Sequence, residues 1–169
     1  GAEERIALYT GNDDHIVADL LTPFTMCRGG ETVDLRIVGG LLGHWCAWTS
    51  SAVRLLEHCH AAVARGAIDP GLLAEDARVT DSNAAFFDAA NDFRGCIAGC
   101  HEVLRRQGLL ENLTLLDPDE AMSPGQAEAL DRVREAYPDL ADDDFIAANL
   151  SRWLETPPSM TSKTANRVA

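Results

Sequence analysis

The fold class of this chain is predicted from one stretch, Arg5-Ile6-Ala7-Leu8-Tyr9-Thr10-Gly11-Asn12-Asp13-Asp14-His15. Residues 6–9 contain no polar side chain, which is typical of a strand buried on both faces of a parallel sheet. Residues 10–12 favour a turn. Asp13 and Asp14 then suit the start of a helix, since carboxylates cap helices and complement their dipole. The stretch therefore predicts a strand, a polar turn and a helix.

In α/β proteins a polar turn after a buried strand is a common ligand site. The simpler interpretation is a capped connection between strand and helix with no ligand. Asp13 and Asp14 are adjacent and point to different sides, so a pair of carboxylates sharing one proton is not expected from them alone.

A second strand is predicted over residues 33–38, followed by three glycines in residues 39–43. Glycine permits positive φ and a close approach of other groups, so Gly39 and Gly40 mark either a ligand contact or a tight turn. Apolar residues at three- and four-residue spacing predict a long helix over residues 44–65, with Gly66 as its stop. His44 would begin that helix, as a helix-cap residue or as a weaker candidate ligand.

The rest of the chain is predicted to be helical. The first helix, over residues 16–26, is interrupted at Pro23. A short helix covers residues 72–79, and Thr80, Asp81 or Ser82 caps the next, which ends at Gly108. Ser123 begins another with a capping box, and a last helix starts at Asp142 or Asp143. Residues 159–169 are polar and predicted to be disordered.

Composition limits the partners. The 169 residues carry a net charge of -13, which argues against nucleic acid and anionic membranes as partners. No apolar run is long enough to span a bilayer. Five cysteines without the spacing of a disulfide scaffold indicate reduced thiols and a cytoplasmic location.

No metal or cofactor is predicted. Cys59 lies in an apolar stripe between His58 and His60, which diverge on a helix and cannot converge with it on one ion. Cys96 and Cys100 share a helix face but would need two further ligands for zinc. Motifs of serine hydrolases and of dinucleotide-binding proteins are absent, although a phosphate at the helix start after the glycines is conceivable.

The order of these motifs resembles a known family. The segment Tyr9-Thr10-Gly11-Asn12-Asp13-Asp14 is similar to the motif that ends the seventh strand in the dihydrodipicolinate synthase / N-acetylneuraminate lyase family. Residues 37–40 are similar to the end of that family's eighth strand. Residues 86–110 and the helix after Ser123 resemble its C-terminal helices. The resemblance covers nearly all of residues 5–136 and looks closest to a divergent branch of the family.

The resemblance implies a (β/α)8 barrel, a TIM barrel, with a helical extension. Residues 1–66 would form its last two βα units, strands seven and eight, and residues 67–158 the C-terminal helical extension. A complete barrel needs more residues, so the chain is expected to be the C-terminal part of a homo-oligomeric enzyme. Taken alone, it should be mainly helical.

The family forms a Schiff base between a lysine and pyruvate or another 2-oxo acid. That lysine is expected before residue 1, because the single lysine, Lys163, matches nothing in the family. The resemblance implies a substrate site at the barrel mouth. Its expected residues are Gly11, Asn12, Asp13, Asp14, Gly39, Gly40 and His44.

Within that site Gly11 would let the main chain approach the substrate, and Asn12 or Asp13 would orient the substrate or the lysine. Two departures from the family put the substrate in doubt: the order Gly11-Asn12-Asp13, and Gly39-Gly40 in place of small polar residues. Because the Schiff-base lysine is expected before residue 1, the chain is expected to be inactive by itself. The alternative is a non-enzymatic acidic helical module for protein–protein contact.

Overall fold

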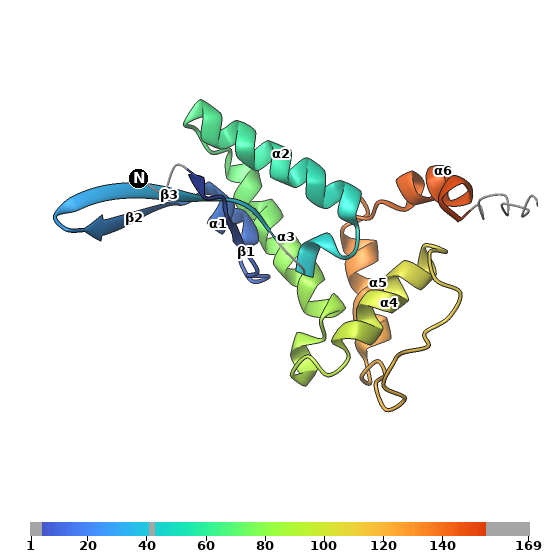
Figure 1. Cartoon of the computed structure of the whole chain (residues 1–169). Helices are drawn as coiled ribbons and strands as arrows, with labels where there is room; N and C mark the ends of the chain where they lie inside the picture. The colour runs from blue at the N-terminus through green and yellow to red at the C-terminus, as the bar shows by residue number, and fades with distance from the viewer. Residues whose placement is uncertain (1–4, 41–42, 155–169) are drawn as a thin grey trace, which may run out of the picture.

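The computed structural model describes residues 5–40 and 43–154. A small sheet lies at one end of the molecule, and helices form the rest (Figure 1). The elements in chain order are β1 (Leu8–Thr10), α1 (Ile16–Leu21), β2 (Pro23–Arg28), β3 (Glu31–Gly40), the 3-10 helix η2 (Gly43–Trp45), α2 (Thr49–Arg65), α3 (Pro70–Phe86), the 3-10 helix η3 (Ala89–Asn91), α4 (Cys96–Arg106), α5 (Gln126–Ala136) and α6 (Asp143–Leu154).

The sheet contradicts the expected barrel. Its three strands have the order β1-β3-β2. β1 and β3 are parallel, as predicted, with Thr10 opposite Gly40. β2, however, pairs antiparallel with residues 31–36 of β3. Every strand of a (β/α)8 barrel has parallel neighbours, so this arrangement does not correspond to strands seven and eight of a TIM barrel.

The strand β2 was missed because its residues were assigned to an interrupted helix. The helix does end before Pro23, at Leu21, and Pro23 then opens the strand, a position where proline costs no ladder hydrogen bond. Gly29 and Gly30 both have positive φ, 60° and 87°. Two such residues form the tight turn that suits a two-residue hairpin, and the hairpin makes residues 23–28 a strand.

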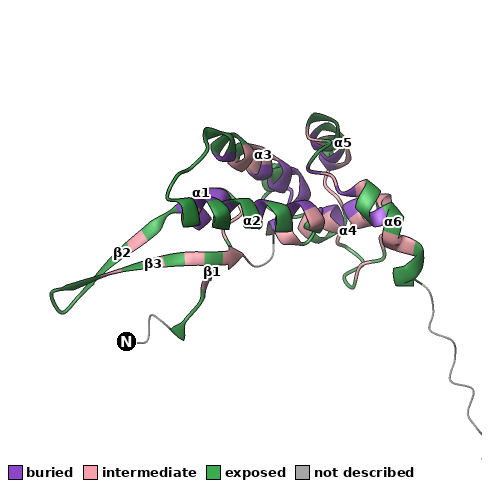
Figure 2. Cartoon of the chain, turned by 90° about the horizontal axis from the view of Figure 1, so that it is seen from above, coloured by how far each residue is buried: buried purple, intermediate pink, exposed green. Residues whose placement is uncertain are grey.

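The prediction that residues 6–9 are buried on both faces is wrong. Ile6 is 57% exposed and Tyr9 60% exposed. The buried side chains of the molecule lie mainly on the helices, and the hairpin of β2 and β3 extends away from them (Figure 2). A run of apolar residues in an edge strand of a small sheet can therefore remain exposed to solvent.

The core forms around α1, which packs against both α2 and α3. The large apolar side chains of α1 are all buried: Ile16, Val17, Leu20 and Leu21. α2 contributes Leu55, Cys59 and Ala62, and α3 contributes Val79 and Phe86. The predicted role of Cys59 in core packing is confirmed, since this side chain is fully buried.

Several helix boundaries differ from the prediction, among them the start of α5 at Gln126, which follows Gly125 and not a cap at Ser123. α2 begins at Thr49, not at His44, and ends at Gly66 as predicted, with φ of 66°. α3 runs without a break through residues 80–82, because the hydroxyls of Thr80 and Ser82 do not cap the start of a new helix. Thr80 donates to the main-chain oxygen of Asp14, and Ser82 donates to that of Arg78 over 2.9 Å.

The chain breaks instead after Phe86, where Asp88, Asp92 and Phe93 have positive φ. Asp88 stabilises this break by accepting hydrogen bonds from the main-chain nitrogen of Gly95, at 2.9 Å, and from the hydroxyl of Ser123. The expected uninterrupted helix up to Gly108 is therefore divided, and only residues 96–106 form α4.

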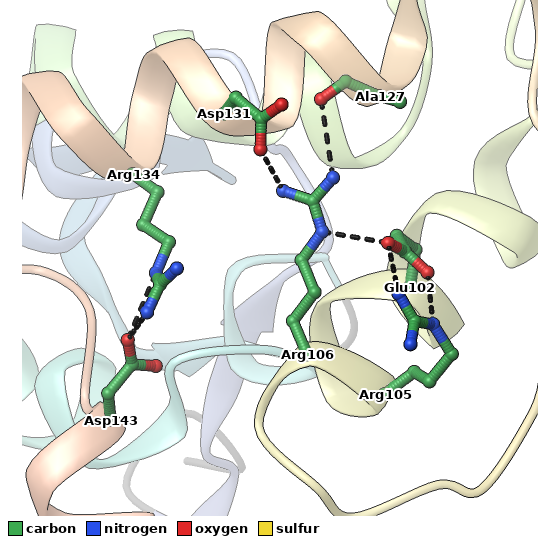
Figure 3. Close-up of polar contacts among 7 residues, drawn as sticks. All are labelled: Glu102, Arg105, Arg106, Ala127, Asp131, Arg134 and Asp143. Carbon is green, nitrogen blue, oxygen red and sulfur yellow. Dashed lines mark hydrogen bonds and ion pairs between the residues drawn. The ribbon is translucent and has the colours of Figure 1, made fainter.

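Arginine–carboxylate pairs join the last three helices (Figure 3). Glu102 of α4 accepts from Arg105 at 2.7 Å and from Arg106 at 2.8 Å. Arg106 also binds Asp131 of α5 at 2.6 Å, and Arg134 of α5 binds Asp143 of α6 at 2.6 Å. α6 begins at Asp143 as predicted. The predicted disordered tail, residues 159–169, lies outside the described residues.

Candidate functional site

The structure brings two of the predicted segments together. Because β1 and β3 are parallel, their carboxyl ends lie at the same edge of the sheet, with Tyr9 opposite Gly39 and Thr10 opposite Gly40. The turn 11–14 therefore begins beside the glycines that end β3. We call this edge, made of residues 11–14, Gly39, Gly40 and His44, the strand-end site.

The turn is held by its own polar groups. The main-chain nitrogen of Asn12 donates to the hydroxyl of Thr10 at 3.0 Å, and the main-chain nitrogen of Asp14 donates to the side-chain oxygen of Asn12 at 2.9 Å. Thr10 donates in turn to Asp19 at 2.8 Å. Asn12 thus braces the turn, which limits its freedom to orient a ligand.

Residues of α3 hold the turn from the other side. The side-chain amide of Asn83 donates to the main-chain oxygen of Asp13 at 3.2 Å, and Thr80 donates to that of Asp14. Asp76 accepts from the main-chain nitrogen of Val17 at 3.0 Å. These residues were not predicted to belong to the site. Asp76, Thr80 and Asn83 are spaced by four and three positions, so they lie on one face of the helix. This spacing is the sequence pattern that could have identified them as a group.

The Asp13 carboxyl lies in an environment that is unusual for an acidic side chain. Its Oδ1 atom is buried and has no hydrogen-bond partner among the residues that the structure describes. Burial raises the pKa of this carboxyl; the main-chain N–H of His44 partly offsets the effect, and the charge of Asp14 adds to it. A carboxyl in such surroundings takes up a proton more readily than an exposed one.

His44 lies next to Asp13 in the short helix η2 and is only 2% exposed. It is not the cap of α2, because that helix starts five residues later. Both ring nitrogens lack a partner within the described part of the chain, and the ring meets Trp45 edge to face at 5.5 Å. Burial lowers the pKa of His44 to about 4, so the imidazole is neutral at pH 7.

The glycines of the site have different roles. A Cβ atom added to Gly40 would lie 2.2 Å from the ring of Trp45, so close packing requires glycine there. A Cβ added to Gly11 or Gly39 would meet nothing within 4 Å. Neither Gly39 nor Gly40 has positive φ, so the backbone conformation does not require glycine at these positions. Gly11 and Gly39 leave open space beside the main chain.

Three cysteines gather close to this site. The Sγ atoms of Cys46 and Cys100 are 3.5 Å apart, and Cys96 lies one turn before Cys100 on α4. Cys96 and Cys100 were considered together from their spacing, whereas Cys46, which is 54 positions from Cys100, was not grouped with them. Within residues 5–40 and 43–154, no group of three or more His, Cys, Asp or Glu side chains is arranged to hold a metal ion.

The chain has no match among models of protein families, curated proteins or solved structures. The resemblance to the dihydrodipicolinate synthase / N-acetylneuraminate lyase family therefore stays a prediction. None of the described helices is both long and apolar enough to cross a membrane.

Proposed function

We propose that the strand-end site binds a small 2-oxo acid such as pyruvate and presents it to a Schiff-base-forming lysine, as in a lyase or aldolase. The observation that supports this proposal is the meeting of a buried, unpartnered carboxyl oxygen, Oδ1 of Asp13, with the buried, unpartnered ring of His44, beside open main chain at Gly11 and Gly39. Buried polar atoms without partners carry a cost that a bound ligand would remove.

The charges at the site fit an anionic ligand only if one carboxyl is protonated. A 2-oxo acid brings its own carboxylate, which Asp13 and Asp14 would repel when both are ionised. The raised pKa of Asp13 lowers the cost of protonating it, and a protonated carboxyl donates a hydrogen bond to a carboxylate. The neutral ring of His44 offers one further donor and one acceptor.

The reacting amine must come from outside the described residues. A Schiff base forms when an unprotonated lysine amine attacks the carbonyl carbon and water leaves. Arginine cannot replace lysine, because its guanidinium stays protonated. The single lysine of the chain, Lys163, lies outside the described residues. In this proposal the chain orients the substrate, and a segment that precedes it, or another chain, supplies the amine.

Pyruvate binding tests the proposal. We expect added pyruvate to shift the amide NMR signals of Gly11, Gly39 and Gly40, with a stronger effect as the pH is lowered from 7, because protonation of Asp13, whose pKa is raised, relieves the repulsion. Asp13→Leu should remove these shifts, whereas Asp119→Leu, at an exposed position in the loop between α4 and α5, should keep them. Unchanged signals at saturating pyruvate across this pH range would refute the proposal.

One observation favours a second function, the acidic helical interaction module. A groove of about 620 Å³ lies between α2 and α6, and its walls include Val53, Phe145 and Trp153, which are 44%, 47% and 43% exposed. Exposed apolar grooves of this kind often bind amphipathic helices. Because the chain is acidic, the expected partner is a basic helix.

A basic amphipathic model peptide tests this second function. Binding in the groove should shift the fluorescence of Trp153 to shorter wavelength, and Phe145→Asp should abolish the shift while Tyr9→Asp, on the sheet, should not. An unchanged spectrum would reject the groove as a helix-binding site. Self-association of the chain, also expected from the resemblance, stays a prediction that sedimentation can test.

A further inference from the structure

Three thiols meet where the segment after η2 passes α4. Cys46 is exposed, and Cys96 and Cys100 are half-buried on one face of α4. The Sγ atoms of Cys46 and Cys100 are 3.5 Å apart. A disulfide requires about 2.0 Å between its sulfur atoms, so the two sulfur atoms would form the bond on approaching each other by about 1.5 Å.

We propose that Cys46 and Cys100 form a reversible disulfide and that this pair is a redox site for low-molecular-weight disulfides. This inference does not depend on the proposed 2-oxo acid site. The two other cysteines lie elsewhere: Cys27 on β2, and Cys59 buried in the core.

The reaction proceeds by two exchange steps. The Cys46 thiolate attacks one sulfur of the external disulfide, forming a mixed disulfide and releasing one thiolate. The Cys100 thiolate then attacks Sγ of Cys46, forming the Cys46–Cys100 bond and releasing the second thiolate. The two cysteines are oxidised by two electrons and lose two protons, and the external disulfide is reduced to two thiols.

The environments of the two thiols determine which of them reacts first. Cys46 is exposed, and a hydrogen bond with the Cys100 thiol lowers the pKa of Cys46. The same contact and burial raise the pKa of Cys100. Cys46 is therefore the thiolate that reacts first, since thiolates and not thiols attack disulfides. Cys100 then lies in contact with the sulfur that it must attack.

The disulfide would link distant parts of the chain. Cys46 precedes α2, and Cys100 lies in the middle of α4, 54 positions later. Cys46 is also close enough to Asp13 for the carboxylate charge to affect the Cys46 thiol. Oxidation would therefore tie the segment that carries His44 to α4, at the border of the strand-end site.

Oxidised glutathione is the probe for this site. After incubation and blocking of free thiols, we expect the number of blocked cysteines to fall from the five present in the reduced chain to three, with peptide mapping placing the bond between Cys46 and Cys100. Loop-closure entropy predicts a rise of about 10 °C in melting temperature on oxidation. Dithiothreitol should reverse both changes.

Substitutions distinguish this pair from the other thiols. Cys46→Ser and Cys100→Ser should each abolish the bond and the rise in melting temperature, whereas Cys27→Ser should keep both. The proposal is overturned if Cys46 and Cys100 both remain free at glutathione ratios that modify the exposed Cys27. A bond mapped between Cys96 and Cys100, within α4, would overturn it equally.

Discussion

Gln126 and Gly95 are joined by a hydrogen bond of 3.0 Å from the side-chain amide nitrogen to the main-chain oxygen. The same nitrogen lies 3.3 Å from the main-chain oxygen of Phe86, and Oε1 of Gln126 accepts from the main-chain nitrogen of Ser123 at 3.1 Å. One side chain, 2% exposed, therefore serves main-chain groups at the end of α3, before α4 and before α5.

Replacing Gln126 by alanine should destabilise the protein strongly. The substitution leaves buried main-chain groups without partners and opens a cavity, with an expected cost of about 3 kcal/mol in the free energy of unfolding. Urea unfolding followed by circular dichroism measures it. Glu128→Ala, exposed on the same helix, is the control and should cost less than about 0.5 kcal/mol.

Glu102 should make stability depend on acid. Its side chain is 6% exposed between Arg105 and Arg106, and hydrogen bonds from these arginines lower the pKa of Glu102 to about 2, from 4.5. A lowered carboxyl pKa contributes stability above pH 4.5 that is lost as the pH falls toward 2.

Glu102→Gln should therefore cost about 2 kcal/mol at pH 7 and progressively less below pH 4.5. Urea unfolding at a series of pH values measures the difference. Glu57→Gln, at an exposed position of α2, is the matched control. A cost for Glu102→Gln that is equal at pH 7 and pH 2 would show that the ion pairs are not its cause.

His44 should weaken the fold in mild acid. Burial lowers its pKa from 6.5 to about 4, so the unfolded chain binds the proton more readily, and stability is lost as the pH falls from 6.5 to 4. His44→Leu removes this loss and should raise the free energy of unfolding by about 2 kcal/mol relative to the parent chain at pH 5.

Thermal unfolding at pH 7 and pH 5 gives the comparison for His44. His58→Leu, the same change at an exposed position, should leave the loss between these pH values in place. NMR titration of the His44 ring protons provides a direct check. A midpoint near the ordinary histidine value would contradict the buried, neutral state of this ring.

Borohydride treatment with pyruvate should leave the mass of this chain unchanged. Lys163 is its one lysine, and the proposed substrate site provides no amine of its own. Mass spectrometry of the whole chain measures any reduced adduct. Trapping that Lys163→Arg abolishes would show that the amine is on this chain, and that the proposed division of roles is wrong.

Local patterns were sufficient for much of the fold. β1, β3, the end of α2 at Gly66 and the start of α6 were all predicted, because each depends on neighbouring residues: an apolar run, a glycine in the left-handed region, or acidic residues before an apolar face. The turn 11–14 and the glycines that end β3 were grouped on the basis of the family resemblance. They lie at the same edge of the sheet because parallel strands place their carboxyl ends together.

Contacts between segments that are far apart in the sequence determined the rest of the fold. Residues 23–28 form a strand because β3 pairs with them, and that antiparallel pairing is what excludes the barrel. Thr80 lies inside α3 because its hydroxyl binds the turn before α1, 66 positions earlier in the chain. Cys46 meets Cys100 across 54 positions. Such pairings depend on how helices pack, and no short-range pattern encodes that packing.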